Sequence, residues 1–176
     1  MVLALAVPQG FVSHPELAQR VQFAAATPVS VYCAPDAAAW QTFLDAVGFA
    51  NRPGETDGFA EAVGGSWAGI SPSTCAVLLA KIHNKALRVL DPSTFRYVRR
   101  PVTLYELGDT LFVLVHEMEH LKGITDENDA DCAALYQMPQ AARAFGIRKP
   151  SKLRVVMRGA VDHHRGSTLA YNARPC

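Results

Sequence analysis

Two histidines stand four residues apart in the segment HEMEH, residues 116–120, and a glutamate directly follows the first. On an α-helix, positions four apart lie on one face, with Cβ atoms roughly 5–6 Å apart. His116 and His120 can therefore direct their imidazoles at one metal ion, and zinc accepts neutral nitrogen ligands in tetrahedral geometry. Glu117 projects beside that position, where its carboxylate can take a proton from a coordinated water molecule. The segment predicts a zinc site with a catalytic base.

A catalytic zinc site also needs a third protein ligand and an open position for water. Asp126, Glu127 and Asp131 follow closely and are all candidates. Acids are common in the first turn of any helix, where they oppose its macrodipole, so their presence alone does not choose among them. We expect Glu127 to be the ligand, because Asp131, four residues further on, can then hold a ligand histidine in place. Asp126 is the alternative ligand.

The plainer interpretation of these residues is a polar face of a solvated helix. The apolar run LFVLV at residues 111–115 argues against it, because it makes this helix largely buried. Buried histidine and glutamate side chains need partners, and a metal ion is one. Two alternatives stay open: a non-catalytic zinc site completed by Asp131 or Cys132, and a metal-free interaction domain.

Hydrophobic spacing predicts the elements that carry these residues. Apolar side chains at three- and four-residue intervals predict a helix from about residue 101 or 103 to Gly123. A second helix is expected from a cap at Thr125 to about Tyr136, before Pro139. The tail from residue 163 to the end is expected to be irregular.

The rest of the chain predicts a mixture of helices and strands in an α+β fold, with the helix of residues 116–120 packed on a small, mostly antiparallel sheet. The segment SWAGI, residues 66–70, is the expected edge strand of this sheet. The other expected elements are helices at 15–26, 35–47 and 71–86, a loop at 51–58, and a hairpin at 59–70 that turns at Gly64-Gly65.

Composition narrows the possible functions. The chain has 176 residues, 49% hydrophobic and 19% charged, which suggests one folded domain over residues 1–176. A formal net charge of +1 gives no electrostatic footprint for nucleic acid. The apolar start, residues 1–8, is too short to span a membrane. A complete signal peptide begins with a positively charged region, and here the first cationic residue is Arg20.

The motif resembles known zinc peptidases in two ways. HExxH is the pattern of zinc metallopeptidases. With Gly123 and Asp126 it resembles the metzincin pattern HExxHxxGxxD. Glu127 to Asp131 instead resembles the ExxAD element of gluzincin-type peptidases, in which the glutamate ligates zinc from the next helix and the aspartate accepts a hydrogen bond from a ligand histidine. The stretch is similar to a minimal gluzincin-like zincin.

This resemblance implies a zincin-like fold that holds one Zn²⁺ per chain and cleaves amide bonds in a peptide or protein substrate. Glu117 would take a proton from the attacking water and deliver it to the leaving amine. A further donor is expected to stabilise the oxyanion. His163, His164 and Tyr171 are candidates if the tail folds over the zinc, although surface placement is the plainer expectation for each.

The chain is also similar to small actinobacterial proteins that carry HExxHxxG followed closely by ExxAxC. Their outlying motifs have counterparts here in VYC at 31–33, SPSTC at 71–75, and a tyrosine shortly before the final cysteine. This resemblance implies the disulfide pairs Cys33–Cys75 and Cys132–Cys176. Paired cysteines favour a secreted or cell-envelope protein, and unpaired cysteines a cytoplasmic one.

Overall fold

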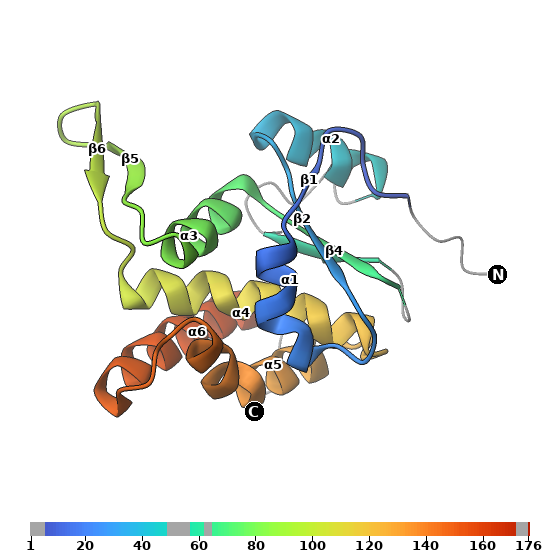
Figure 1. Cartoon of the computed structure of the whole chain (residues 1–176). Helices are drawn as coiled ribbons and strands as arrows, with labels where there is room; N and C mark the ends of the chain where they lie inside the picture. Colours follow the sequence, from blue (N-terminus) through green and yellow to red (C-terminus); the bar gives the residue numbers. More distant parts are fainter. Residues whose placement is uncertain (1–5, 49–56, 62–64, 172–175) are drawn as a thin grey trace.

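A computed structural model of the chain describes residues 6–48, 57–61, 65–171 and 176, with side chains up to residue 166 and at 176 (Figure 1). The predicted loop at 51–58 and the Gly64-Gly65 turn fall largely outside the described residues. In chain order the elements are β1 (Val12–Ser13), α1 (Pro15–Val21), the 3-10 turn η1 (Gln22–Ala24), β2 (Ser30–Cys33), α2 (Ala37–Ala46), β3 (Gly58–Ala60), β4 (Trp67–Ile70), α3 (Pro72–Ile82), β5 (Leu87–Asp91), β6 (Arg96–Arg100), α4 (Leu104–Leu121), α5 (Glu127–Ala144) and α6 (Pro150–Tyr171).

The larger sheet has the strand order β1-β2-β4-β3. Strands β2 and β4 are parallel, whereas β1 pairs with β2 and β3 pairs with β4 in antiparallel fashion. The expected α+β class and the β3–β4 hairpin are therefore confirmed. The expectation that SWAGI forms an edge strand was wrong, because β4 lies between β2 and β3 and all four of its residues are buried. In the part of the chain that the structure describes, β3 is the outer strand on that side.

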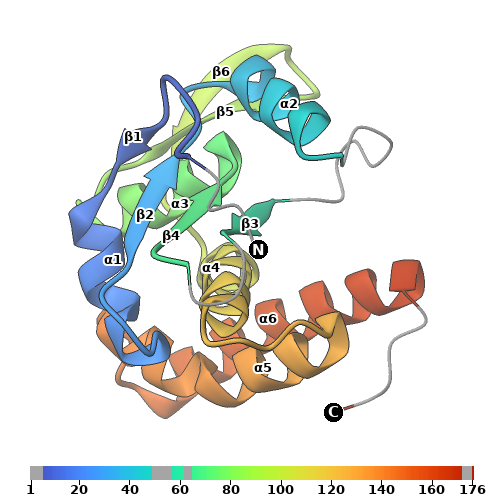
Figure 2. The ribbon, with the colours of Figure 1, turned by 90° about the vertical axis from the view of Figure 1, so that its right-hand side faces the viewer.

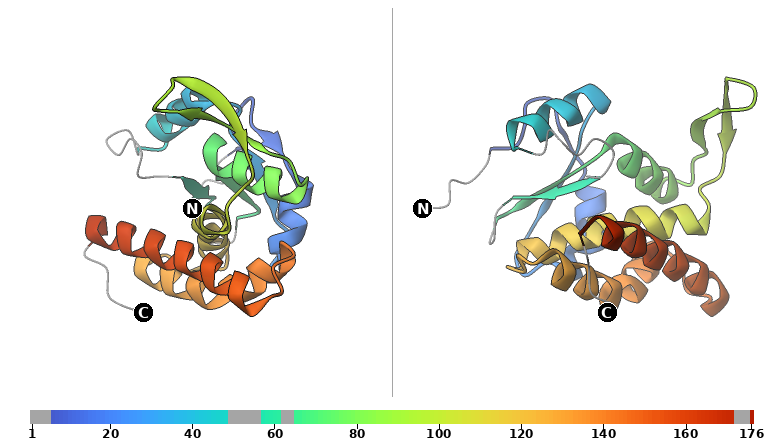
Figure 3. Two further views of the ribbon diagram at one scale, coloured as in Figure 1. Left: turned by 90° about the vertical axis from the view of Figure 1, so that its left-hand side faces the viewer. Right: turned by 180° about the vertical axis from the view of Figure 1, so that it is seen from behind.

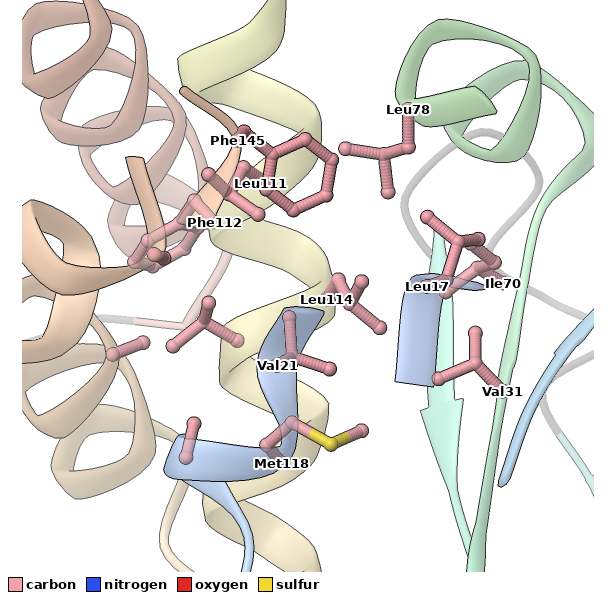
Figure 4. Close-up of a cluster of buried hydrophobic side chains, with 14 of the residues drawn as sticks. Leu17, Val21, Val31, Ile70, Leu78, Leu111, Phe112, Leu114, Met118 and Phe145 are labelled. Atoms are coloured by element: carbon pink, nitrogen blue, oxygen red, sulfur yellow. The ribbon is translucent and has the colours of Figure 1, made fainter. Parts of the chain in front are cut away.

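The sheet separates two apolar clusters. On one face, side chains that alternate along β2 and β4 join α1, α3 and α4 in the main core. Figure 4 shows this core around α4, whose Leu111, Leu114 and Met118 lie among side chains of α1, α3 and β4. On the other face, α2 packs Trp40 and Phe43 against Trp67. Both faces of the sheet are thus covered by helices.

Helix α4 passes through the centre of the molecule, between the strands and the helices α5 and α6 (Figure 2). Thr103 begins it with a capping box, in which the threonine side chain accepts from the Glu106 amide and the Glu106 carboxylate accepts from the Thr103 amide. The side chain of Arg100 also pairs with Glu106. The helix ends two residues before Gly123, whose φ of 111° suits a glycine at the turn into α5.

Helix α5 differs from its prediction at both ends. Asp126 caps it instead of Thr125, because the Asp126 carboxylate accepts hydrogen bonds from the amides of Asn128 and Asp129. The helix also continues through Pro139 to Ala144. The expected stop before Pro139 was wrong because Met138 before the proline and Ala141 after it are fully buried, so tertiary packing outweighs the lost backbone hydrogen bond.

The expectation of an irregular tail was also wrong, since residues 150–171 form helix α6. Helices α4 and α6 cross closely through two glycines. A Cβ atom at Gly108 would overlap the carbonyl oxygen of Val156, and one at Gly159 would overlap that of Tyr105. This crossing holds α6 against the helix that carries the HExxH motif.

The predicted helices near the N-terminus and at 71–86 are confirmed, with shorter bounds. The hairpin of β5 and β6 had no counterpart in the sequence prediction. It projects from the body, and most of its side chains are exposed (Figures 1 and 3). Both implied cysteine pairs are confirmed at disulfide distance, with Cα–Cα separations of 5.9 Å for Cys33–Cys75 and 5.4 Å for Cys132–Cys176. Among the described residues no helix is long and apolar enough to cross a membrane.

Candidate metal centre

Three predicted ligands converge from two helices. His116 and His120 lie one turn apart on α4, and Glu127 is the first residue of α5. The Nε2 atoms of the two histidines are 2.8 Å apart, and Glu127 Oε2 lies 3.1 Å from His116 Nε2 and 3.4 Å from His120 Nε2. The short turn between α4 and α5 therefore brings one carboxylate oxygen to the point at which both rings are directed.

The other ring nitrogens face away from this point and have partners. His120 Nδ1 lies 2.6 Å from the carbonyl oxygen of Ile124, which can only accept, so this ring donates from Nδ1. His116 Nδ1 lies 2.7 Å from Asp131 Oδ1, close enough for an ion pair but poorly aligned for a hydrogen bond. When both rings are neutral, protons on the two Nδ1 atoms leave both Nε2 lone pairs directed toward the point beside Glu127 Oε2. This is the tautomer that a zinc ligand requires.

Glu127 lies beside the Nε2 atoms of the two histidines, whereas Asp126 and Asp131 make other contacts. The Asp126 carboxylate is bound to backbone amides of its own helix. Asp131 directs one oxygen at His116 and the other at His164. Of the three acids considered from sequence, Glu127 has the position of a ligand and Asp131 that of a partner that supports the ligand His116.

The charges of the cluster favour metal binding. Burial alone would lower the pKa of His116, but its contacts with Asp131 and Glu127 outweigh burial and raise the pKa to about 10. Burial likewise opposes the charge on His120, and Glu127 raises the pKa of that ring overall. The hydrogen bonds with His116 and His120 hold the pKa of Glu127 well below its usual range. Without metal, protons on the imidazoles balance the carboxylates. A divalent cation can replace that positive charge.

Glu117 lies beside this cluster and is 6% exposed. Burial raises the pKa of its carboxyl, although the nearby His116 and His120 oppose the shift. The carboxylate also lies against strand β3, since a Cβ atom at Gly58 would be 2.5 Å from Glu117 Oε1. Sequence reasoning did not identify Gly58, because the contact depends on how β3 crosses α4.

The donor set fits zinc. The three ligand atoms lie within 4.8 Å of one another and comprise two imidazole nitrogens and one carboxylate oxygen, a combination found in catalytic zinc sites. Within the described residues no fourth side chain joins them. Cys132 is bonded to Cys176, and the two oxygens of Asp131 face His116 Nδ1 and His164 Nδ1 and not the point where the three ligand atoms meet. A zinc ion held by these three residues would keep a coordination position for water or substrate.

The predicted oxyanion donors lie in different places. His163 Nδ1 is 2.8 Å from Asp109 Oδ1, and its ring lies 5.3 Å from that of Phe112. His164 is buried and bonded to Asp131. Tyr171 is the last residue of α6, and its side chain lies outside the described residues. From sequence, His164 was a candidate oxyanion donor only if the tail folds over the zinc, and a surface position was the plainer expectation. Its buried contact with Asp131 follows from the helical tail, which that reasoning missed.

A second group of possible ligands lies far from the first in sequence. His14, Cys33 and Cys75 also bring one ligand atom each within 4.8 Å of the others. The two sulfur atoms are bonded to each other, however, and zinc is ligated by thiolates. His14 Nδ1 also contacts Glu16 Oε1 at 3.0 Å. With the disulfide formed, this group is not a metal centre.

Comparison with known proteins leaves the site to be interpreted from its own chemistry. No family model, curated protein or solved structure matches this chain. The zincin resemblance therefore depends on the motif residues themselves.

Proposed function

We propose that this protein is a zinc-dependent hydrolase, and that it cleaves amide bonds in peptides or proteins. The convergence of His116, His120 and Glu127, with the buried Glu117 beside them, carries this proposal. A structural zinc would call for a fourth protein ligand, and the residues nearest to that role are already engaged with other partners.

Zinc would supply a Lewis acid that polarises a substrate carbonyl and makes a coordinated water more acidic. The protein's own residues supply the proton transfers. Glu117 accepts a proton from the attacking water and delivers it to the leaving amine. Its buried position suits this role, because burial raises the pKa of the carboxyl and so makes the carboxylate a stronger base.

Strand β3 is the proposed binding edge for an extended peptide. It is the outer strand on its side of the described sheet, and Gly58 lies against Glu117. A substrate that pairs with β3 through backbone hydrogen bonds would pass beside the catalytic base. Such pairing recognises the backbone of an extended peptide more than its side chains. It therefore favours unfolded proteins or flexible segments as substrates, because these can adopt an extended conformation.

A mixture of unfolded protein and peptides, incubated with the zinc-loaded protein, tests this proposal. Glu117→Gln should retain zinc and lose hydrolysis, because the amide keeps the shape of the side chain but cannot take up a proton. Glu119→Gln is the matched control, since Glu119 is also buried on α4 but pairs with Lys122. Zinc binding without hydrolysis of any substrate would favour a non-catalytic zinc site. Equal loss of activity in both variants would show that buried charge, rather than a base, is required.

A further inference from the structure

His164 is a buried histidine that has no role in the proposed reaction. It lies on α6 and is 5% exposed. Its Nδ1 atom is 2.9 Å from Asp131 Oδ2, and Asp131 Oδ1 is 2.7 Å from His116 Nδ1. One carboxylate thus bridges two imidazoles, of which one is a proposed zinc ligand.

We infer that His164 is a positioning residue for the metal centre, which holds the Asp131 carboxylate in its ion-pair contact with His116 Nδ1. This inference rests on the proposed function, since it concerns the same zinc site. An ionised carboxylate can only accept hydrogen bonds, so His164 donates from Nδ1. A carboxylate held at one oxygen can still rotate, whereas one held at both oxygens cannot.

The surroundings of His164 restrict its own movement. Its second nitrogen, Nε2, lies 3.6 Å from the sulfur of Cys176. Cys176 is bonded to Cys132, the residue that follows Asp131. The disulfide therefore ties the end of the chain to the helix turn that carries Asp131, beside the imidazole. The ring of Phe112 lies 6.3 Å away.

The chain of contacts joins three helices. His116 belongs to α4, Asp131 to α5 and His164 to α6. The close crossing at Gly108 and Gly159 sets the distance between α4 and α6. Residues that support a metal ligand typically affect metal affinity 10- to 100-fold. Because His164 acts through Asp131, we expect its loss to weaken zinc binding about 10-fold, the lower end of that range.

The test measures zinc affinity by competition with a chelator, together with the urea unfolding of each zinc-free protein. His164→Leu should bind zinc about 10-fold more weakly. His164→Asn should recover most of the affinity, because its amide nitrogen can take the place of Nδ1 as a donor. His163→Leu is the matched control: His163 is the neighbouring histidine on α6 and also pairs with an aspartate, Asp109, but should leave zinc affinity unchanged.

A double-mutant cycle separates positioning from a general loss of stability. In an Asp131→Ala background, His164→Leu should weaken zinc binding no further, because the carboxylate through which it acts is absent. Unchanged affinity in His164→Leu, or the same loss with and without Asp131, would overturn the inference. If His164→Leu does not fold, His164→Asn against His164→Gln repeats the comparison. Absence of zinc from the wild-type protein would overturn the proposed function as well, whereas zinc binding without hydrolysis leaves this test intact.

Discussion

The carboxylate of Glu117 lies directly against the backbone of Gly58, and a Cβ atom at that glycine would be 2.5 Å from Glu117 Oε1 and 2.8 Å from Val113 Cγ1. Strand β3 and helix α4 approach so closely there that only glycine fits. The position of the proposed base therefore depends on a residue outside the HExxH motif.

Gly58→Ala is predicted to displace Glu117 and lower hydrolysis about 100-fold, because misplacing a catalytic group by about 1 Å has an effect of that size. Zinc content should not change, since the atoms nearest to the added Cβ belong to Glu117 and Val113 and not to the three ligands. Gly166→Ala is the control, because an added Cβ meets no atom within 4 Å there. Activity assays and metal analysis of both variants check the prediction, which full activity in Gly58→Ala would contradict.

Zinc affinity is predicted to rise with pH across the neutral range. The pKa of His116 is about 10 in the metal-free protein, because its acidic partners outweigh burial, so zinc must displace a proton from this ring. Raising the pH removes that competing proton and favours the metal. Chelator competition between pH 6 and 9 measures the slope, and calorimetry in buffers of different ionisation enthalpy measures the protons released. A pH-independent affinity without proton release would contradict this account.

The cap of α4 is predicted to lose its stabilising effect in acid. The hydrogen bond from Arg100 is the main cause that lowers the pKa of Glu106 to about 2 from an ordinary 4.5. A depressed pKa stabilises the fold above the ordinary value, and this contribution disappears as the pH falls from about 4.5 to about 2. Because the pair is partly exposed, we expect about 1 kcal/mol rather than the full value of the shift.

Urea unfolding of wild-type protein and Glu106→Gln measures this contribution. The two free energies of unfolding should differ by about 1 kcal/mol at pH 7 and converge toward pH 2. A constant difference at every pH would show that the Glu106 charge has no part in the cap.

The crossing of α4 and α6 is predicted to tolerate no side chain. Gly159→Ala should lower the free energy of unfolding by about 3 kcal/mol, because its Cβ would overlap the Tyr105 carbonyl and force the helices apart. Gly166→Ala, on the same helix, should be neutral or slightly stabilising, since alanine favours helix more than glycine does. Equal stability of the two variants, measured by urea unfolding, would contradict the close crossing.

The core of the candidate site was predictable because it is local in sequence. The apolar stripe of α4 and the four-residue spacing of His116 and His120 placed both rings on one face. A short turn left Glu127 within reach. These relationships depend on helix geometry alone, and the structure confirms that the three residues meet.

The supporting residues were not predictable, for physical reasons that differ. Leu153, Val156, Met157 and Ala160 of α6 face the core at helical spacing, but this spacing ends there and does not show that the helix continues through His163 and His164. Its position, and hence the partner of His164, therefore went unrecognised. Strand order is a tertiary property, so local alternation did not show that β3, rather than β4, lies at the edge. The β5–β6 hairpin has mostly exposed side chains, and β6 is exposed along nearly its whole length, so it offers little of the hydrophobic alternation that predicts a strand.

Metal content of the purified protein, prepared without a chelating tag and supplied with zinc, tests the central claim most directly. Glu127→Ala is compared with Asp126→Ser, which retains a helix cap. We predict about one zinc per chain in wild-type protein and Asp126→Ser, and loss of zinc in Glu127→Ala. Zinc absent from the wild-type protein, or lost with Asp126→Ser and kept with Glu127→Ala, would contradict the account.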